Sequence, residues 1–261
     1  MFRIITYDEM IEFLNSLDKN VIKEEKNIGY STYGEPIRHY SYGHGNKHVI
    51  LSAGKHACEL ITNVFVLLFM KKICDKEIYI DENKYTVHFF PFENPEGTII
   101  VTSAIRALIP KESNYLTEQL TCLEYYLNSI FDDISVNNYG EKQDMLSLLM
   151  FKHIDYRCIP EKYAKIKESL KEIFNKNNLG YGVLSTWSSN ANGVDLNANI
   201  ECGEYLKRFL ENGSNNPNSR LCNIDLFKQG PLGCPSRFRD RFVEEPENTA
   251  LINYYKYLKE N

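Results

Sequence analysis

The feature of this sequence that most constrains its fold is a strand–helix–strand pattern over residues 48–90. The run HVILSAG at residues 48–54 is short and apolar and ends in glycine, which is typical of a buried strand. An apolar helical segment follows from Glu59 to Ile73, and YTVHFF at residues 85–90 predicts a second strand. Because a connection of this length is a crossover, we expect the two strands to lie parallel in an α/β sheet.

Further elements are predicted on both sides of this unit. Apolar residues at helical spacing predict a helix over Tyr7–Leu17, and two strand-like runs that meet at Tyr33–Pro36 predict a hairpin. A last helix is expected to begin at Pro246, because proline suits the first helical position. We therefore expect one domain over residues 1–261, with a mixed, partly parallel sheet and helices on both faces.

The alternation of strands and helices is interrupted over residues 98–185. Two helical segments are predicted there, Ser113–Phe131 and Glu161–Phe174. After them, turn-forming residues dominate residues 185–199, and a polar, Asn-rich loop is expected over residues 201–223. We interpret residues 98–185 as a helical insertion within the domain and not as a second domain.

Composition and charge exclude several classes of protein. The formal net charge of -5 provides no basic stripe for a phosphate backbone, so we expect no nucleic-acid partner. The longest apolar run, Val64–Met70, is far shorter than the roughly 20 residues of a membrane helix. Residues 1–20 mix acidic with apolar side chains, unlike a secretory signal, so we expect a cytoplasmic protein. Seven cysteines without a C-x-x-C pair argue against a disulfide framework and against a cysteine zinc cluster.

A histidine and a glutamate stand three residues apart where the first predicted strand meets the helix. Open α/β sheets place ligands at the carboxyl ends of their strands, where His56 falls, and Glu59 lies on the first helical turn. Zinc in hydrolases is commonly held by histidine and carboxylate groups, so this pair could supply two ligands. Alternatively, the helix dipole favours an acidic residue at this position without any metal. The spacing leaves both interpretations open.

Four stretches of the chain, in their order and structural setting, resemble the zinc metallocarboxypeptidase family, the carboxypeptidase A-like peptidases. They are GKHACE at residues 54–59, FPFENPEGT at 90–98, WSSNANGVDLNAN at 187–199 and EEPENTAL at 244–251. The resemblance runs from Val21 onward, apart from the insertion. It implies a carboxypeptidase-like fold and a zinc-dependent peptidase that hydrolyses an amide near the C-terminus of a peptide substrate.

The resemblance also implies roles for individual residues. His56 and Glu59 look like the first two zinc ligands, and Asp195 looks like the carboxylate that accepts a hydrogen bond from the ligand histidine and fixes its tautomer. Asn197 corresponds to the asparagine that helps to hold the terminal carboxylate of the substrate. Residues 94–97, Asn-Pro-Glu-Gly, are expected to form a turn that shapes the site.

The sequence departs from the family where arginines are expected to bind the carboxylate and the scissile carbonyl. Those places read Cys58, Ser188 and Ala198, and each lost charge-assisted contact is worth about 1.5 to 3 kcal/mol. Arg106 is our candidate replacement for substrate binding, although a solvated surface arginine is the alternative. Two further candidates are Arg237 and Arg239.

The resemblance places the third zinc ligand, a histidine, on a strand after the final helix, and the general base further downstream. This chain ends inside that helix, and no histidine follows His153. We therefore expect the C-terminal strands of the family to be lacking and the catalytic base to lie beyond the chain end. A sheet shortened in this way has an open edge, which a partner chain or an oligomer would cover.

Three functional hypotheses follow from these observations. The first is a zinc-dependent peptidase of the metallocarboxypeptidase type, or the N-terminal part of one, acting on a standard or a cell-wall peptide. The second is a catalytically inactive, peptide-binding remnant of that family. The third pairs Cys58 as nucleophile with His56 as base, but neighbours in a first helical turn point apart.

Overall fold

The structure is a computed structural model, and it describes residues 6–108, 154–177, 184, 187–197, 199–200 and 244–260. Some of the sequence predictions lie outside these residues. They are the helical segment at 113–131, the loop at 201–223, and the side chains of His153, Arg237 and Arg239.

The centre of the molecule is a four-stranded mixed sheet in the order β1-β4-β6-β5. Its strands are β1 (Lys23–Glu24), β4 (Tyr40–Gly43), β5 (Lys47–Ser52) and β6 (Tyr85–Phe90). β6 pairs in parallel with β5, with Val49 opposite Val87, and antiparallel with β4. The predicted parallel crossover and the mixed α/β sheet are therefore confirmed. The predicted hairpin forms as well, because β2 (Gly29–Tyr30) pairs antiparallel with β3 (Pro36–Ile37).

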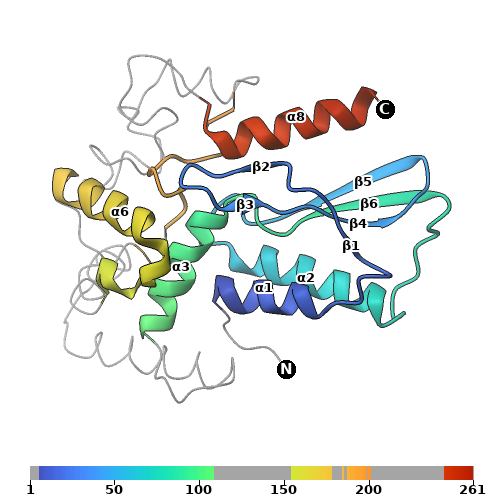
Figure 1. The fold of residues 1–261 in the computed structure, drawn as a ribbon, viewed down its shortest axis with the longest axis horizontal. Coiled ribbons are helices and arrows are strands. Elements are labelled where there is room, and N and C mark those ends of the chain that lie inside the picture. The colour runs from blue at the N-terminus through green and yellow to red at the C-terminus, as the bar shows by residue number, and fades with distance from the viewer. Residues whose placement is uncertain are drawn as a thin grey trace, which may run out of the picture.

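Helices cover both faces of this sheet (Figure 1). α1 (Tyr7–Ser16) and α2 (Leu60–Cys74) lie on one face, and α8 (Pro246–Glu260) lies on the other. Beyond one end of the sheet lie α3 (Pro95–Leu108) and α6 (Ala164–Asn177), with the short helices η1 (Tyr156–Cys158) and η2 (Glu161–Tyr163). Among the described helices, none is both long and apolar enough to cross a bilayer.

The central strand β6 is buried on both faces, which explains its nearly continuous apolar sequence. Successive side chains of a strand point to opposite faces. Phe89 accordingly faces α2, with its ring centroid 6.3 Å from that of Phe69, and Phe90 faces α8, 5.3 Å from the ring of Tyr254. The core thus has two layers, one on each side of this strand.

The structure corrects the turn predicted at residues 94–97. Asn94 is the N-cap of α3, because its side-chain oxygen accepts a hydrogen bond of 2.9 Å from the Gly97 amide. Pro95 occupies the first helical position, for which its fixed φ is suited. α3 therefore runs through residue 98, where the insertion was predicted to begin, and Ile99 and Ile100 are fully buried core residues. Asparagine and proline signal a turn and a helix start equally well, so the sequence could not separate the two.

Three histidines form a hydrogen-bonded row across the α8 face of the sheet. His39 Nε2 lies 3.0 Å from His88 Nδ1, and His88 Nε2 lies 2.8 Å from His48 Nδ1. The ring centroids are 5.2 and 5.1 Å apart and the rings are close to coplanar, so the nitrogens meet head to head. The hydroxyl of Tyr254 on α8 joins the row, 3.0 Å from His88 Nδ1. The row thus ties α8 to β5, to β6 and to the segment that leads into β4.

This row makes stability depend on pH. Burial, and then the neighbouring ring, lowers the pKa of His39 and of His88 from 6.5 to about 4. At a pH between these two pKa values the unfolded chain binds more protons than the folded chain, so lowering the pH favours unfolding. Because buried carboxyl groups near α8 act in the opposite direction, the expected effect is a difference between proteins. As the pH falls across this range, the rings of His39 and His88 should each lower the free energy of unfolding in urea by about 2 kcal/mol, relative to a variant that lacks that ring. His39→Gln should flatten the dependence, whereas His44→Gln, outside the row, should keep it; an equal slope in both variants would contradict the prediction.

A second buried polar cluster lies where the hairpin, α3 and α8 meet. Glu96 accepts hydrogen bonds from the Ser31 hydroxyl and from the Tyr33 amide, the latter at 2.6 Å. Glu247, in the first turn of α8, is fully buried and accepts a long 3.4 Å hydrogen bond from Asn190 Nδ2. Burial, with further repulsion from other carboxylates, raises the pKa of Glu96 to about 7 and that of Glu247 to about 8. These carboxyl groups are therefore largely protonated in mildly acidic solution.

The carboxyl cluster gives the opposite pH dependence. A folded-state pKa raised from 4.5 to about 8 means that the folded chain binds the extra proton, so stability declines as the pH rises through this range. We expect Glu247→Gln, which keeps the neutral shape, to be more stable than the wild type by about 2 to 4 kcal/mol at about pH 9 and equal to it at about pH 4. Urea denaturation at both pH values measures this. The exposed Glu168→Gln is the control, and a constant difference between wild type and Glu247→Gln at both pH values would refute the prediction.

Candidate functional site

The candidate metal ligands lie in the connection between β5 and α2. After the strand, Gly54 has a φ of +70° and leaves no room for a Cβ beside the amide of Asn63, which fixes glycine at the bend. Glu59 is the residue before α2, but its side chain makes no capping hydrogen bond to the helix. Its Oε1 lies instead 3.2 Å from Nδ1 of His56. The carboxylate thus faces the imidazole and not the helix end.

The other nitrogen of the same ring faces Asp195. His56 Nε2 lies 3.2 Å from Asp195 Oδ1, and this carboxylate also accepts a 2.9 Å hydrogen bond from the Asn197 amide. The hydrogen bond to Asp195 is the largest cause of a rise in the pKa of His56 to about 9, against the effect of burial, and Glu59 adds to it. Without a metal, the ring is therefore an imidazolium held between two carboxylates.

The donor types at this position fit part of a zinc site. When Nε2–H is donated to Asp195, the remaining lone pair of His56 is on Nδ1, which points toward Glu59. Imidazole nitrogen and carboxylate oxygen are both usual zinc ligands. Within the described residues, however, no group of three or more His, Cys, Asp or Glu side chains could hold a metal. The described part of the chain thus offers two candidate ligands, one fewer than catalytic zinc sites normally have.

Asp195 is presented by a compact loop over residues 187–197. The indole Nε1 of Trp187 donates to the Asn190 carbonyl at 2.9 Å, and the Asn190 side chain accepts from two amides of the same loop, those of Asn192 and Val194. This satisfies polar groups that are fully buried, and it turns a stretch rich in turn formers into a rigid support. α8 holds the end of the loop, because Asn248 Nδ2 donates to the Leu196 carbonyl at 2.8 Å.

The two predicted substrate-binding residues lie in different places. Asn197 is exposed directly beside Asp195. Arg106 is in the last turn of α3, about 14 Å along the helix axis from Gly97, which adjoins Ala57. The structure therefore places Asn197, but not Arg106, beside the carboxylate that faces His56. The role of both residues in substrate binding stays a prediction.

Two other side chains near His56 bear on the alternatives. Burial raises the pKa of Cys58, which does not favour the thiolate that a nucleophile requires. Lys55 is a cation that the sequence interpretation did not consider. Its Nζ lies 3.3 Å from Glu93 Oε2 and 3.3 Å from Asn248 Oδ1, so its charge is balanced by a buried carboxylate.

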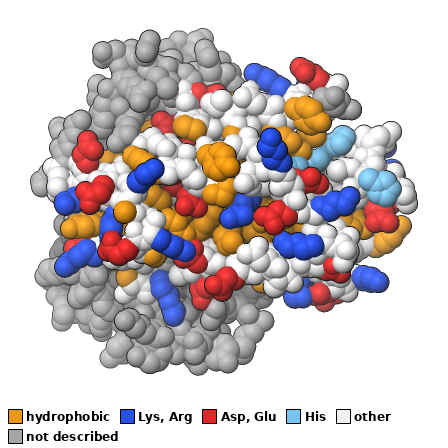
Figure 2. Space-filling model, in the orientation of Figure 1, with side chains coloured by type: hydrophobic (Ala, Val, Ile, Leu, Met, Phe, Trp, Pro, Cys, Tyr) orange, Lys and Arg blue, Asp and Glu red, His pale blue; other side chains and the backbone are white. Residues whose placement is uncertain are grey.

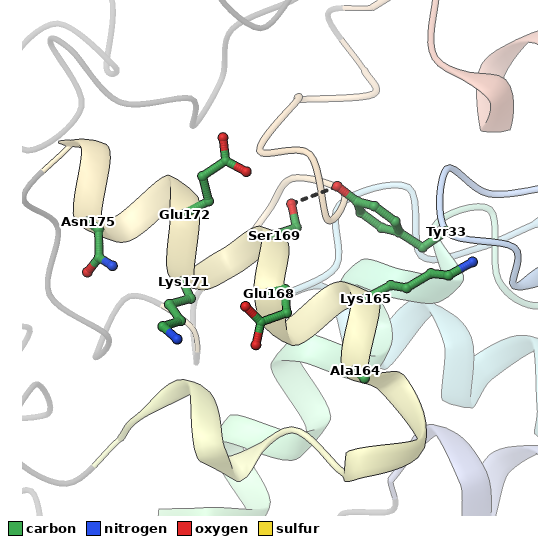
Figure 3. Close-up of a pocket in the computed structure, with 8 residues that line it drawn as sticks. All are labelled: Tyr33, Ala164, Lys165, Glu168, Ser169, Lys171, Glu172 and Asn175. Atoms are coloured by element: carbon green, nitrogen blue, oxygen red, sulfur yellow. Dashed lines mark hydrogen bonds between the residues drawn. The ribbon is translucent and has the colours of Figure 1, made fainter.

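An open groove of about 600 Å³ runs along α6, and its lining includes neither His56 nor Asp195 (Figure 3). Tyr33 closes one end, where its hydroxyl contacts Ser169 at 2.8 Å. The charged side chains that line the groove are Lys165, Glu168, Lys171 and Glu172. On the face shown in Figure 2, basic and acidic side chains of the described residues are likewise intermixed. The groove has the mixed charge of an ordinary helix surface.

The sequence interpretation missed residues that support the site without touching it. Asn94, Asn190 and Asn248 all donate to backbone carbonyls or carboxylates around His56 and Asp195. The signal available was the presence of asparagine in three of the four motif stretches. Asparagine is so common in loops that this signal indicates a turn at least as well as a buried support.

Comparisons with known proteins point to the same family as the four motif stretches, the first two of which lie within the matched residues. The sequence profile of the zinc carboxypeptidase family matches residues 9–147, just over half of the chain. No curated protein matches. Two of the similar solved structures are a bovine thrombin-activatable fibrinolysis inhibitor in complex with a tick carboxypeptidase inhibitor, and a metallo-carboxypeptidase from Burkholderia cenocepacia.

The identity to these two structures is 18% and 16%, with TM-scores of 0.27 and 0.29. The matches cover 34% and 47% of this chain, and only 28% and 38% of the solved chains, so this chain corresponds to well under half of either. Superpositions of this extent carry no argument about activity. The family assignment depends on the profile match, and by that match this chain belongs to the zinc carboxypeptidase family.

Proposed function

We propose that this chain is a zinc-dependent peptidase of the metallocarboxypeptidase type, or the part of one that holds the first two zinc ligands. The reaction would be hydrolysis of an amide near the C-terminus of a peptide substrate. The observation that carries the proposal is the imidazole of His56, held between Glu59 and Asp195 in a member of the zinc carboxypeptidase family. From sequence alone, we also propose that the protein acts in the cytoplasm.

In this proposal each residue has a distinct task. His56 Nδ1 and Glu59 would hold the zinc, which when bound would act as a Lewis acid toward the peptide carbonyl. Asp195 keeps the proton on Nε2 and fixes the plane of the ring. The exposed Asn197 stands beside this group and would donate to the terminal carboxylate of the substrate. The third ligand and the general base would come from outside the described residues.

The alternative is a peptide-binding remnant without turnover. It is favoured by the two-ligand site of the described residues and by the side chains that stand where the family carries arginine, Cys58, Ser188 and Ala198. Two ligands bind zinc more weakly than three, and catalytic zinc sites rely on three fixed donors. Metal content separates the two functions.

Zinc binding is the first expected outcome. Purified without added metal, the full chain should contain about one zinc per chain by elemental analysis. The His56→Ala variant should lose the zinc, because the substitution removes one of the two proposed zinc ligands. His44→Gln, an exposed histidine elsewhere, is the matched control and should retain the metal. A folded wild-type protein free of zinc would argue for the remnant and against the peptidase.

We also propose that another chain covers the outer edge of β5. Within the described residues, β5 pairs on one side only, with β6. Val49 and Ile50 on this strand are 39% and 38% exposed, and Ile61 and Phe65 on α2 are 75% and 57% exposed. An open edge strand flanked by apolar side chains tends to pair with another chain.

A charge on this edge should prevent that association. We expect the wild type to sediment as an assembly larger than one chain at micromolar concentration, and Ile50→Lys to sediment as a monomer, because a lysine on an edge strand opposes pairing. Tyr79→Lys is the control, since Tyr79 is a large apolar side chain that is 88% exposed, more than Ile50, but lies outside the strand. Monomeric wild-type protein at all concentrations would rule out self-association through β5.

A further inference from the structure

The side chain of Asn94 joins three separate segments of the chain. It is fully buried, and its amide group uses every polar hydrogen in a hydrogen bond. One acceptor for Nδ2 is the carbonyl of Lys55 at 3.2 Å, and the other is the carbonyl of Ser189 at 3.1 Å. Its Oδ1 accepts from the Gly97 amide at 2.9 Å. Only the last of these bonds is needed to cap α3.

The two carbonyls belong to the segments that carry the site. Lys55 immediately precedes His56, and Ser189 lies in the loop over residues 187–197 that presents Asp195. A second link between the same segments is the 3.3 Å hydrogen bond from the Ala57 amide to the Ser188 carbonyl. β5 and β6 are parallel, so residues that follow them meet at one edge of the sheet, and this brings Asn94 to Lys55.

The first turn of α3 approaches both segments closely at Gly97. A Cβ on this residue would lie 2.5 Å from Asn94 Nδ2, 2.6 Å from the Ser189 carbonyl oxygen and 2.7 Å from Ala57 Cβ. The backbone carbonyl and the Ala57 Cβ cannot swing away, and the Asn94 amide group is held in place by its three hydrogen bonds. Glycine at this position therefore lets the asparagine bridge reach both carbonyls.

We propose that Asn94 is a positioning residue: its hydrogen bonds to the Lys55 and Ser189 carbonyls, here called the Asn94 bridge, hold the imidazole of His56 against Asp195. Gly97 leaves the space that these hydrogen bonds require. The expected effect on zinc affinity rests on the proposed zinc function. The expected effect on the contact between the His56 imidazole and the Asp195 carboxylate does not. A helix cap alone would be served equally well by serine or aspartate, which offer an acceptor but not two N–H groups. The two donated hydrogen bonds are what asparagine adds.

Asn94→Ser separates capping from bridging. Serine keeps an acceptor for the Gly97 amide, but it cannot reach both carbonyls. In the zinc-free full chain, nitrogen-15 NMR of the histidine side chains should show a His56 Nε2–H that is protected from exchange with water. We expect Asn94→Ser to speed this exchange about tenfold or more, and to raise the Kd for zinc about 10- to 100-fold.

Thr6→Ala is the matched control. It removes the capping box of α1 while leaving Asn94 and its three partners intact, so it should lower the melting temperature but change neither readout. The two readouts also separate this inference from the proposed function. A wild-type chain that binds no zinc refutes the peptidase, while the exchange of the His56 Nε2–H still tests the bridge.

The inference is overturned if Asn94→Ser leaves both the exchange rate and the zinc affinity at their wild-type values. Should that variant fail to fold, Gly97→Ala provides the second test, because the added methyl group presses on the bridge and leaves the cap residue in place. Faster exchange in Gly97→Ala supports the positioning role, and wild-type exchange in it refutes that role.

Discussion

Because β5 and β6 are parallel, both strands end at the same end of the sheet. The backbone segments that follow the two strands continue to form hydrogen bonds with each other beyond the last strand residues. The Ala53 amide donates to the Phe90 carbonyl at 3.0 Å, and the Glu93 amide donates to the Ala53 carbonyl at 2.8 Å. The segments that follow therefore start in register. His56 leaves one strand and Asn94 leaves the other, and their positions relative to each other are set by the sheet.

The other segments around the site are attached to this end of the sheet by hydrogen bonds. The loop that presents Asp195 is joined to it through Asn94, and the first turn of α8 closes over the far end of the loop through Asn248. These contacts are hydrogen bonds between buried polar groups, which cost free energy whenever a partner is lost. A site assembled in this way keeps its geometry as long as the whole network is satisfied.

The polar interior also has two ionisable parts with opposite behaviour. The histidine row under α8 favours the neutral form of imidazole, and the carboxyl cluster beside it favours the protonated form of glutamate. Both shifts have the same main cause, which is the cost of burying charge. α8 takes part in both groups, through Tyr254 and Glu247. Its attachment to the sheet is therefore weakened by acid through the histidine row and by base through the carboxyl cluster.

The sequence by itself determined the local elements and nominated the two side chains, His56 and Glu59, that lie against each other at the candidate site. Hydrophobic periodicity predicted the strands and helices that flank His56, and four short motifs led to the family that the profile match later showed. The motif also nominated Asp195, well over a hundred residues away, which lies 3.2 Å from His56. These features are local in sequence, or are inherited with a motif, and so they can be read without coordinates.

Only the tertiary structure decided which polar side chains support the site. No local pattern predicts the row of His39, His48 and His88, because sequence gives the face of a strand but not the register that sets neighbouring strands beside each other. Asn94 read as part of a turn, because its two donated hydrogen bonds go to carbonyls that no local pattern can identify. Long-range partners of buried polar groups depend on how the segments pack, and packing is a property of the whole fold.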